Sequence, residues 1–229
     1  MDDAPYTLVE RRERVAGHDL DLVTLHDFEA TVDALCRRQD SAAARWWLED
    51  GCPMFGVIWP AARAACRRVA ADPTIPGAPL LELGCGLALP SLIAARRGGH
   101  PVPTDLHPDA AAFLTRNCER NDLPALPFTA LDWRTPEASG LAPRSFARVV
   151  ASDILYFRDH PPLVAAMFDR FLADDGVGWL ADPGRPHLQA FHDAARALGL
   201  RVHVDVDGDA DDAVFLLTVT RDPGSASGG

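Results

Sequence analysis

"LELGCGLALP", residues 81–90, carries an apolar run into two glycines, Gly84 and Gly86, and then into the first turn of a predicted helix. Glycine at the end of a buried strand lets the backbone approach a ligand closely, and the following helix offers unpaired N–H groups at its N-terminus. The segment therefore predicts a strand, a ligand-binding turn and a helix in succession, which is the unit from which open α/β sheets are built.

The chain after residue 78 repeats this unit. Strand-like stretches fall at 79–86, 100–106, 125–131, 146–153, 177–183, 200–206 and 212–221, and helical patterns fill 89–99, 108–123, 161–176 and 186–199. Such alternation is typical of a doubly wound parallel sheet. Only the short segment "DGDADD" joins the last two strands, so they must form a hairpin whose final strand is antiparallel. The predicted fold class is α/β, with a Rossmann-like sheet of seven strands.

The N-terminal region has a different pattern. Residues 6–25 predict two strands around a central turn, and His26 or Asp27 then precedes a helical pattern that it would cap. A second helix is expected to carry Trp46 and Trp47, which suit a packed helix face better than a substrate groove. The chain therefore begins with a hairpin and helical extension before the α/β region.

Composition restricts the partners. The 229 residues carry a formal net charge of −11, which disfavours nucleic acid as the main ligand and favours a small molecule or a basic protein. No apolar run approaches the ~18 residues of a membrane span, and the N-terminus has no apolar signal-peptide core. Five scattered cysteines form no C-x-x-C pair, so we expect neither a metal site nor a disulfide. We expect a cytoplasmic monomer.

An acidic residue follows the second strand of the α/β region. Asp105 lies 19 positions beyond Gly86, where a carboxylate would accept both hydroxyls of a ribose; the alternative is a tight turn with a helix-capping Asp. The loop is not the dinucleotide fingerprint, because Leu89 stands in place of its third glycine. With Glu82 before Gly84, the pattern E-x-G-x-G instead resembles motif I of class I (seven-β-strand) S-adenosylmethionine-dependent methyltransferases.

This resemblance implies a cofactor, S-adenosyl-L-methionine, and a set of residues that bind it. The two glycines would line its methionine part, Asp105 would take the ribose, and Asp132 and Trp133 would meet the adenine, although Trp133 could also be a core aromatic. The full set of cofactor residues implied by the family pattern is Trp59, Glu82, Gly84, Cys85, Gly86, Asp105, Leu106, Asp132, Trp133 and Ser152.

Two further segments narrow the resemblance. "FGVIWPAARAAC" (55–66) is similar to the segment before the core of the methyltransferase-like protein lysine methyltransferases, and "LADPGRP" (180–186) is similar to the lysine methyltransferases of the electron-transfer flavoprotein β subunit. The similarity covers roughly residues 46–200, and the N-terminal hairpin has no counterpart in it. It implies a protein substrate, with that β subunit as one candidate.

The resemblance also divides the chain. Residues 1–55 would form an extension that covers the substrate or cofactor, residues 56–221 the S-adenosylmethionine-dependent methyltransferase domain, and residues 222–229 a flexible tail.

The stretch "SDILYF" (152–157) follows the fourth strand and contains the family's D-x-x-Y motif as Asp153 and Tyr156. Enzymes that methylate planar amide or base nitrogens resemble one another in having a proline pair here, and this stretch has none, so a flexible amine is the better acceptor. We hypothesise that Asp153 captures and aligns that amine and that Tyr156 orients its lone pair. The alternative is a loop hydrogen bond and a packed ring.

Three functions remain open from the sequence. The first is methyl transfer to a protein lysine. A small-molecule N- or O-methyltransferase has the same fold, because fold does not fix function, and a closed lid over the crevice would favour it. A non-catalytic binding module of the same fold is the third.

Overall fold

The computed structural model describes residues 6–38, 51–208 and 213–221. The helix predicted around Trp46 and Trp47 and the tail predicted for 222–229 lie outside these described residues. None of the helices within the described ranges is long and apolar enough to cross a membrane.

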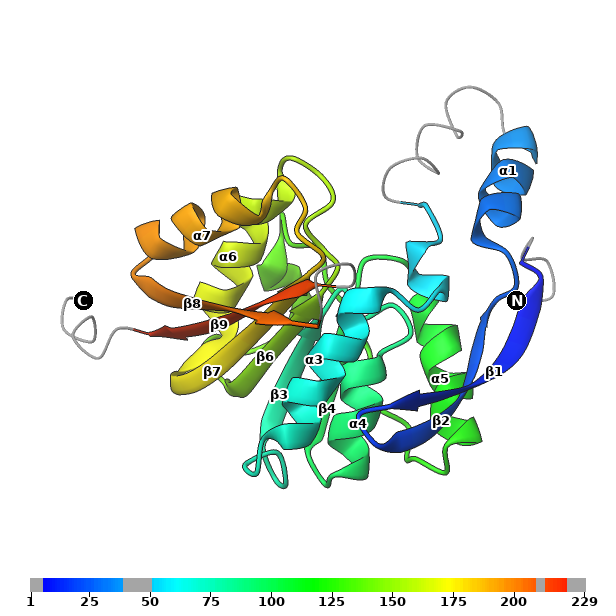
Figure 1. The fold of residues 1–229 in the computed structure, drawn as a ribbon, viewed down its shortest axis with the longest axis horizontal. Coiled ribbons are helices and arrows are strands. Elements are labelled where there is room, and N and C mark those ends of the chain that lie inside the picture. Colours follow the sequence, from blue (N-terminus) through cyan, green and yellow to red (C-terminus); the bar gives the residue numbers. More distant parts are fainter. Residues whose placement is uncertain (1–5, 39–50, 209–212, 222–229) are drawn as a thin grey trace.

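A seven-stranded sheet forms the centre of the α/β region (Figure 1). Its strands are β3 (Pro79–Leu83), β4 (His100–Asp105), β5 (Thr129–Ala130), β6 (Phe146–Ser152), β7 (Leu172–Asp182), β8 (Leu200–Asp207) and β9 (Val214–Arg221), in the order β5-β4-β3-β6-β7-β9-β8. Strands β3 to β7 pair in parallel, whereas β9 lies between β7 and β8 and is antiparallel to both. The predicted fold class and the antiparallel last strand are confirmed.

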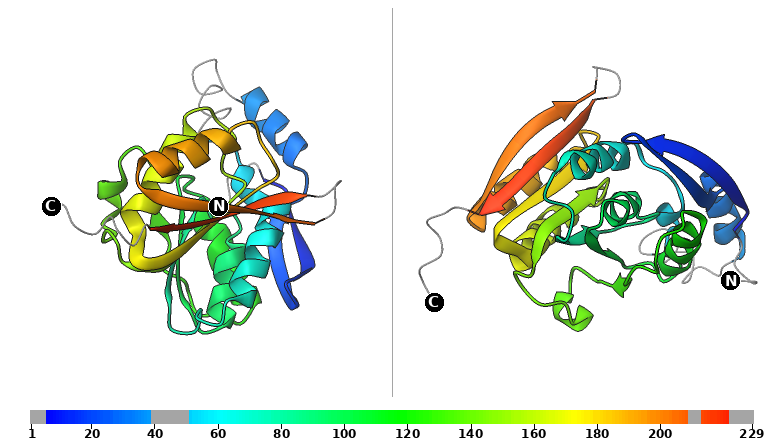
Figure 2. Two further views of the ribbon diagram at one scale, coloured as in Figure 1. Left: turned by 60° about the vertical axis from the view of Figure 1, so that its left-hand side comes forward. Right: turned by 90° about the horizontal axis from the view of Figure 1, so that it is seen from below.

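Helices cover both faces of the sheet (Figure 2). One face packs against α3 (Pro60–Ala71), α4 (Leu89–Arg96) and α5 (Ala110–Arg120), and the other against α6 (His160–Phe171) and α7 (Leu188–Ala197). Neighbouring strand residues alternate between the two cores: Leu80 belongs to the first and Leu81 to the second. Because both faces are covered, the central strands β3 and β6 are mostly apolar.

Two predicted elements differ from the observed ones. The helix predicted to reach residue 176 ends at Phe171, because Leu172 adopts an extended conformation and Arg221 binds the Leu172 carbonyl with its Nε at 3.2 Å. The strand predicted at 125–131 is only two residues long, because Pro124 and Pro127 have no N–H to donate to a sheet.

The N-terminal extension begins with a hairpin of β1 (Leu8–Val15) and β2 (His18–Leu25), followed by α1 (Phe28–Arg38). Its turn places Ala16 and Gly17 at φ 51° and 81°, as a two-residue hairpin turn requires. Asp27 caps α1, since its Oδ1 accepts a hydrogen bond of 2.9 Å from the Ala30 N–H. The predicted hairpin and the helix after it are confirmed.

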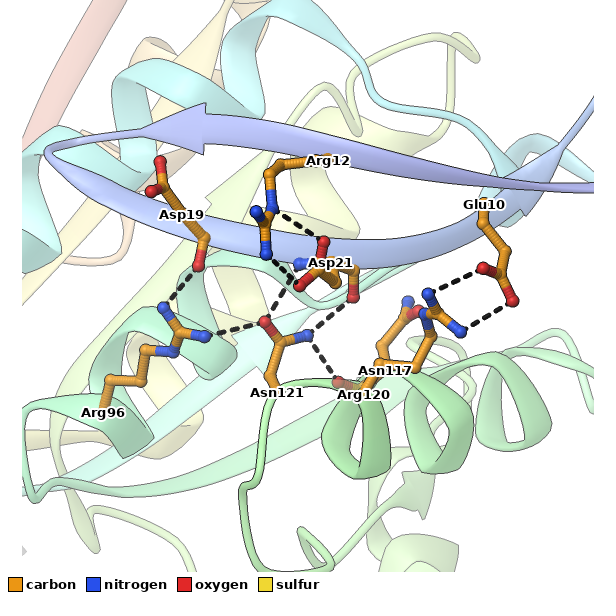
Figure 3. A network of polar contacts seen from close by, with 8 residues as sticks. All are labelled: Glu10, Arg12, Asp19, Asp21, Arg96, Asn117, Arg120 and Asn121. Carbon is orange, nitrogen blue, oxygen red and sulfur yellow. Dashed lines mark hydrogen bonds and ion pairs between the residues drawn. The ribbon is translucent and has the colours of Figure 1, made fainter.

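Two asparagines fix this hairpin to α5 (Figure 3). The Asn117 Oδ1 accepts the Val23 N–H at 2.7 Å, and Asn121 exchanges two bonds with the backbone of Asp21, at 3.1 and 2.7 Å. The asparagines therefore pair with the edge of β2 as a neighbouring strand would. The hairpin extends the helix layer beside the sheet. No residue of the hairpin lines the pocket described next, whose lining in the described part of the chain begins at Cys52.

Candidate active site

A cavity opens at the carboxyl ends of β3, β4 and β6, where ligands bind in open α/β sheets. Its empty volume, including its open mouth, is about 1040 Å³. The structure brings together nearly all the residues predicted for cofactor and acceptor: the lining contains Trp59, Gly84, Cys85, Gly86, Asp105, Leu106, Asp132, Trp133, Ser152, Asp153 and Tyr156. Glu82 is the exception.

The glycine loop approaches the cavity with bare backbone. Gly84 and Gly86 have φ values of 58° and 52°, which side chains other than glycine adopt at a cost. A Cβ on Gly84 would lie 2.8 Å from the Ile154 Cγ2, and one on Gly86 would lie 3.2 Å from the Phe55 carbonyl oxygen. Both positions therefore require glycine for conformation and for space.

Asp105 ties the glycine loop to the tip of β4. Its Oδ2 accepts the Gly86 N–H and its Oδ1 accepts the His107 N–H, each at 2.9 Å. Burial raises the pKa of this carboxyl above its usual value, although both hydrogen bonds oppose the shift. The carboxylate is thus fixed beside the loop, in the place predicted for a ribose partner.

Glu82 lies behind the cavity and not in its wall. It is buried, and its carboxyl accepts the backbone N–H of Ser91 at 2.9 Å as well as the Ser91 hydroxyl. Burial raises the pKa of Glu82 to about 8, against the effect of the Ser91 bonds and with a smaller contribution from Asp105. Glu82 therefore anchors the start of α4 to β3.

The Glu82 pKa predicts how stability depends on pH. In the unfolded chain this carboxyl titrates near 4.5, so between that value and about 8 the folded state holds a proton that the unfolded state has lost. The free energy of unfolding should fall as pH rises through this window, by at most about 1.4 kcal/mol per pH unit. Glu82→Gln should flatten the slope measured by urea unfolding between pH 5.5 and 8. The exposed Glu119→Gln is the control, and an unchanged slope in Glu82→Gln would refute the role.

Two indoles flank the cavity. The Trp59 Nε1 donates to the Met54 carbonyl at 2.9 Å, so the ring is held by the short helix η1 (Met54–Gly56). Trp133 lies beside Gly84, and its ring stands edge-on to His160 at 5.1 Å. The neighbouring Asp132 bonds the Arg134 N–H at 2.9 Å. Trp133 is therefore a wall residue of the cavity, packed on one side.

The turn after β6 holds Asp153 and Tyr156, the residues predicted to meet the methyl acceptor. Asp153 is only 6% exposed and has φ 62°, a rare conformation for a residue other than glycine. Its Oδ2 accepts the Ala61 N–H at 3.1 Å, at the start of α3, and its Oδ1 forms an ion pair with Arg185. Burial raises the pKa of Asp153, and the Arg185 charge opposes the rise. Tyr156 is 37% exposed and presents the more accessible side chain of the motif.

Two histidines of the site were missed from the sequence. His107 accepts the Asp109 N–H on Nδ1, so its Nε2 carries the proton and donates to the Gly51 carbonyl. Burial lowers the pKa of His107, which is the direction that favours this neutral ring. The His160 Nδ1 donates to the Ile154 carbonyl at 2.6 Å and so supports the turn after β6. Neither belongs to a motif used above, since the His107 Nε2 reaches Gly51, 56 positions away, and the His160 contact depends on the shape of the turn after β6.

The geometry fits S-adenosylmethionine. The glycine loop leaves room where a Cβ would otherwise stand, and the Asp105 carboxylate lies at the neighbouring strand end. Within the part of the chain that the structure describes, no three His, Cys, Asp or Glu side chains cluster as metal ligands.

Comparison with known proteins points the same way. The family model described as "Lysine methyltransferase" matches residues 45–182. The human histone-arginine methyltransferase METTL23 is 29% identical over 85 residues, covering 36% of this chain and 45% of that protein. The Schizosaccharomyces pombe protein-lysine N-methyltransferase rrg1 is 32% identical over 108 residues, covering 42% and 35%. The chain therefore matches less than half the length of these two relatives.

Solved structures share the fold. A TehB-like SAM-dependent methyltransferase from Corynebacterium glutamicum superimposes with a TM-score of 0.55 at 17% identity, over 85% of this chain and all of that one. A likeness at this identity concerns the fold alone. The family match is stronger, because it spans more than half of the chain and includes the glycine loop, Asp105 and the turn after β6. The chain belongs to the lysine methyltransferase family, in which S-adenosylmethionine is the methyl donor.

Proposed function

We propose that the protein methylates a lysine side chain of another protein. One observation carries the proposal: the proline-free turn with Asp153 and Tyr156 lines the same cavity as the glycine loop. The cofactor, when bound, supplies a methyl group on a sulfonium, and the protein must align an amine in line with it. Both relatives have names that describe protein substrates, which supports a protein acceptor.

A lysine acceptor must reach the cofactor as a neutral amine. The usual pKa of a lysine side chain, near 10.4, makes deprotonation at pH 7 cost about 4–5 kcal/mol. Phe157 and Tyr156 give the acceptor end of the cavity an aromatic wall, and an apolar surrounding lowers the pKa of an amine. These residues would thus remove water from the amine while the exposed Tyr156 orients its lone pair.

Asp153 has two interpretations in this proposal. Direct capture of the amine remains a prediction. The contacts favour a supporting role, because one carboxyl oxygen faces the start of α3 and the other faces Arg185. In that case Tyr156 would contact the amine, and Asp153 would act indirectly by holding the turn that carries Tyr156.

Other acceptors are outcomes of the test. METTL23 is named as an arginine methyltransferase, so a guanidinium is one alternative, and a small molecule is another. A closed cover would favour a small molecule, but residues 39–50, which belong to the predicted cover, lie outside the described part of the chain. Membership in an enzyme family disfavours the non-catalytic alternative.

Labelled S-adenosylmethionine and a cell lysate test the proposal. We expect label in protein bands, its loss on protease treatment, and methyllysine after acid hydrolysis. Purified electron-transfer flavoprotein β subunit is the first single substrate to try, because of the "DPGRP" resemblance at residues 182–186. The Gly84→Ala variant serves as the inactive control. Methylarginine in the hydrolysate, or label confined to small molecules, would overturn the lysine assignment.

A further inference from the structure

Three segments meet at the Arg185 side chain. Its Nη1 contacts the Asp153 carboxyl and lies 3.3 Å from the Asp182 Oδ2. Asp182 is fully buried at the end of β7, and Asp153 is buried at the end of β6. The Asp153 carboxyl also binds the start of α3 through the Ala61 N–H. One guanidinium therefore connects the loop after β7, the turn after β6 and, through Asp153, the helix that follows Trp59.

The position of Arg185 is itself fixed. The Asp182 Oδ1 accepts the N–H groups of Gly184 and Arg185, at 2.8 and 2.7 Å, so the same carboxylate holds the loop backbone and the guanidinium. Gly184 at φ 91° packs against Phe215, and a Cβ there would lie 2.9 Å from the Phe215 Cε2. The loop that carries Arg185 is thus built to one shape.

Arg185 is also required to balance charge. Two carboxyl groups that are nearly inaccessible to water, Asp153 and Asp182, flank a single guanidinium. A buried carboxylate without a partner is strongly destabilising. Removal of the Arg185 cation should therefore destabilise the position of Asp153 far more than removal of an ion pair on the surface would. The cost falls on a residue that already holds a strained φ of 62°.

We propose that Arg185 is a positioning residue for methyl transfer, which holds Asp153 in its left-handed conformation and thereby places Tyr156 in the cavity. The expected effect of Arg185 on the rate of methyl transfer rests on the proposed function. The connection runs through the chain: Asp153 and Tyr156 belong to one turn, and the Tyr156 ring packs edgewise on His160 at 4.6 Å, while His160 bonds the Ile154 carbonyl. Arg185 itself need touch neither cofactor nor acceptor.

The inference predicts a split between rate and cofactor affinity. Arg185→Ala should lower the rate of labelled methyl transfer into lysate protein by up to about 100-fold, the effect of a misplaced reacting group. The dissociation constant for S-adenosylmethionine, measured by calorimetry, should change little, because Gly84, Gly86 and Asp105 keep their contacts. Arg185→Lys should restore part of the rate, since an ammonium can still pair with one carboxylate.

Hydrogen exchange supplies a readout that does not need an acceptor. In Arg185→Ala, amides of residues 153–157 and of Ala61 should exchange faster, whereas the glycine-loop amides should not. The control is Arg148→Ala, which removes another part-buried ion pair, with Asp72 at 2.6 Å, from the opposite end of the sheet. Equal exchange changes in both variants, or a loss of cofactor affinity in Arg185→Ala that matches its loss of rate, would overturn the positioning role. Absence of methyl transfer by the wild-type protein would instead refute the proposed function, and the hydrogen-exchange result would then decide whether Arg185 positions Asp153.

Discussion

Gly84→Ala is expected to weaken S-adenosylmethionine binding by about 100-fold and to remove measurable methyl transfer. The added methyl group would stand 2.8 Å from the Ile154 Cγ2 and 3.4 Å from the Trp133 Cζ2. Either these side chains shift or the loop moves into the space that the cofactor needs. Overpacking of this kind costs about 1–3 kcal/mol, and about 2.8 kcal/mol corresponds to a 100-fold change in affinity.

Gly77 serves as a matched control that separates the effect of the steric contact at Gly84 from the effect of backbone strain. Gly77 has φ 78° and precedes β3 at its amino end, and a Cβ there would meet no atom within 4 Å. Gly77→Ala therefore shares the conformational cost without the contact. Calorimetry with S-adenosylmethionine should give near wild-type affinity for Gly77→Ala. If both variants bound the cofactor normally, the glycine loop would not be the cofactor site.

The sheet and the glycine loop could be predicted because their signals are local. A strand buried on both faces is a predominantly apolar run, and "PLLEL" before Gly84 is one, with Glu82 as its single polar residue. Asp105 could be predicted because the spacing of successive strand ends in this fold is nearly constant. The structure places its carboxylate on the Gly86 N–H, which it can reach because β3 and β4 are neighbouring strands.

The contacts that support the turn after β6 could not be predicted, because the residues that make them lie far apart in the chain. Asp153 meets the Ala61 N–H, 92 positions away, and its other partner, Arg185, follows the next strand of the sheet. No sequence pattern within one element records such contacts. The same holds for Asn117, because its bond to Val23 depends on where the hairpin lies.

Asp105→Asn should raise the dissociation constant of S-adenosylmethionine by about 10- to 100-fold. The two carboxylate oxygens accept two different backbone N–H groups, those of Gly86 and His107. Asparagine offers one acceptor, so its amide N–H₂ must face a backbone donor whichever way the group turns. An unsatisfied donor costs about 1–3 kcal/mol, and a hydrogen bond from ribose to a charged group contributes about 1.5–3 kcal/mol.

Asp132→Asn is the contrasting variant. Its Oδ1 accepts one backbone N–H, that of Arg134 at 2.9 Å, and the asparagine oxygen can keep this bond. We expect a loss of affinity below about tenfold, corresponding to less than about 1.4 kcal/mol, with little change in melting temperature. In Asp105→Asn the melting temperature should fall as well, because the Gly86 or His107 N–H loses its partner even without cofactor. Equal effects of the two substitutions on affinity would mean that Asp105 does not hold the ribose, and a normal melting temperature in Asp105→Asn would mean that its two backbone bonds do not fix the loop.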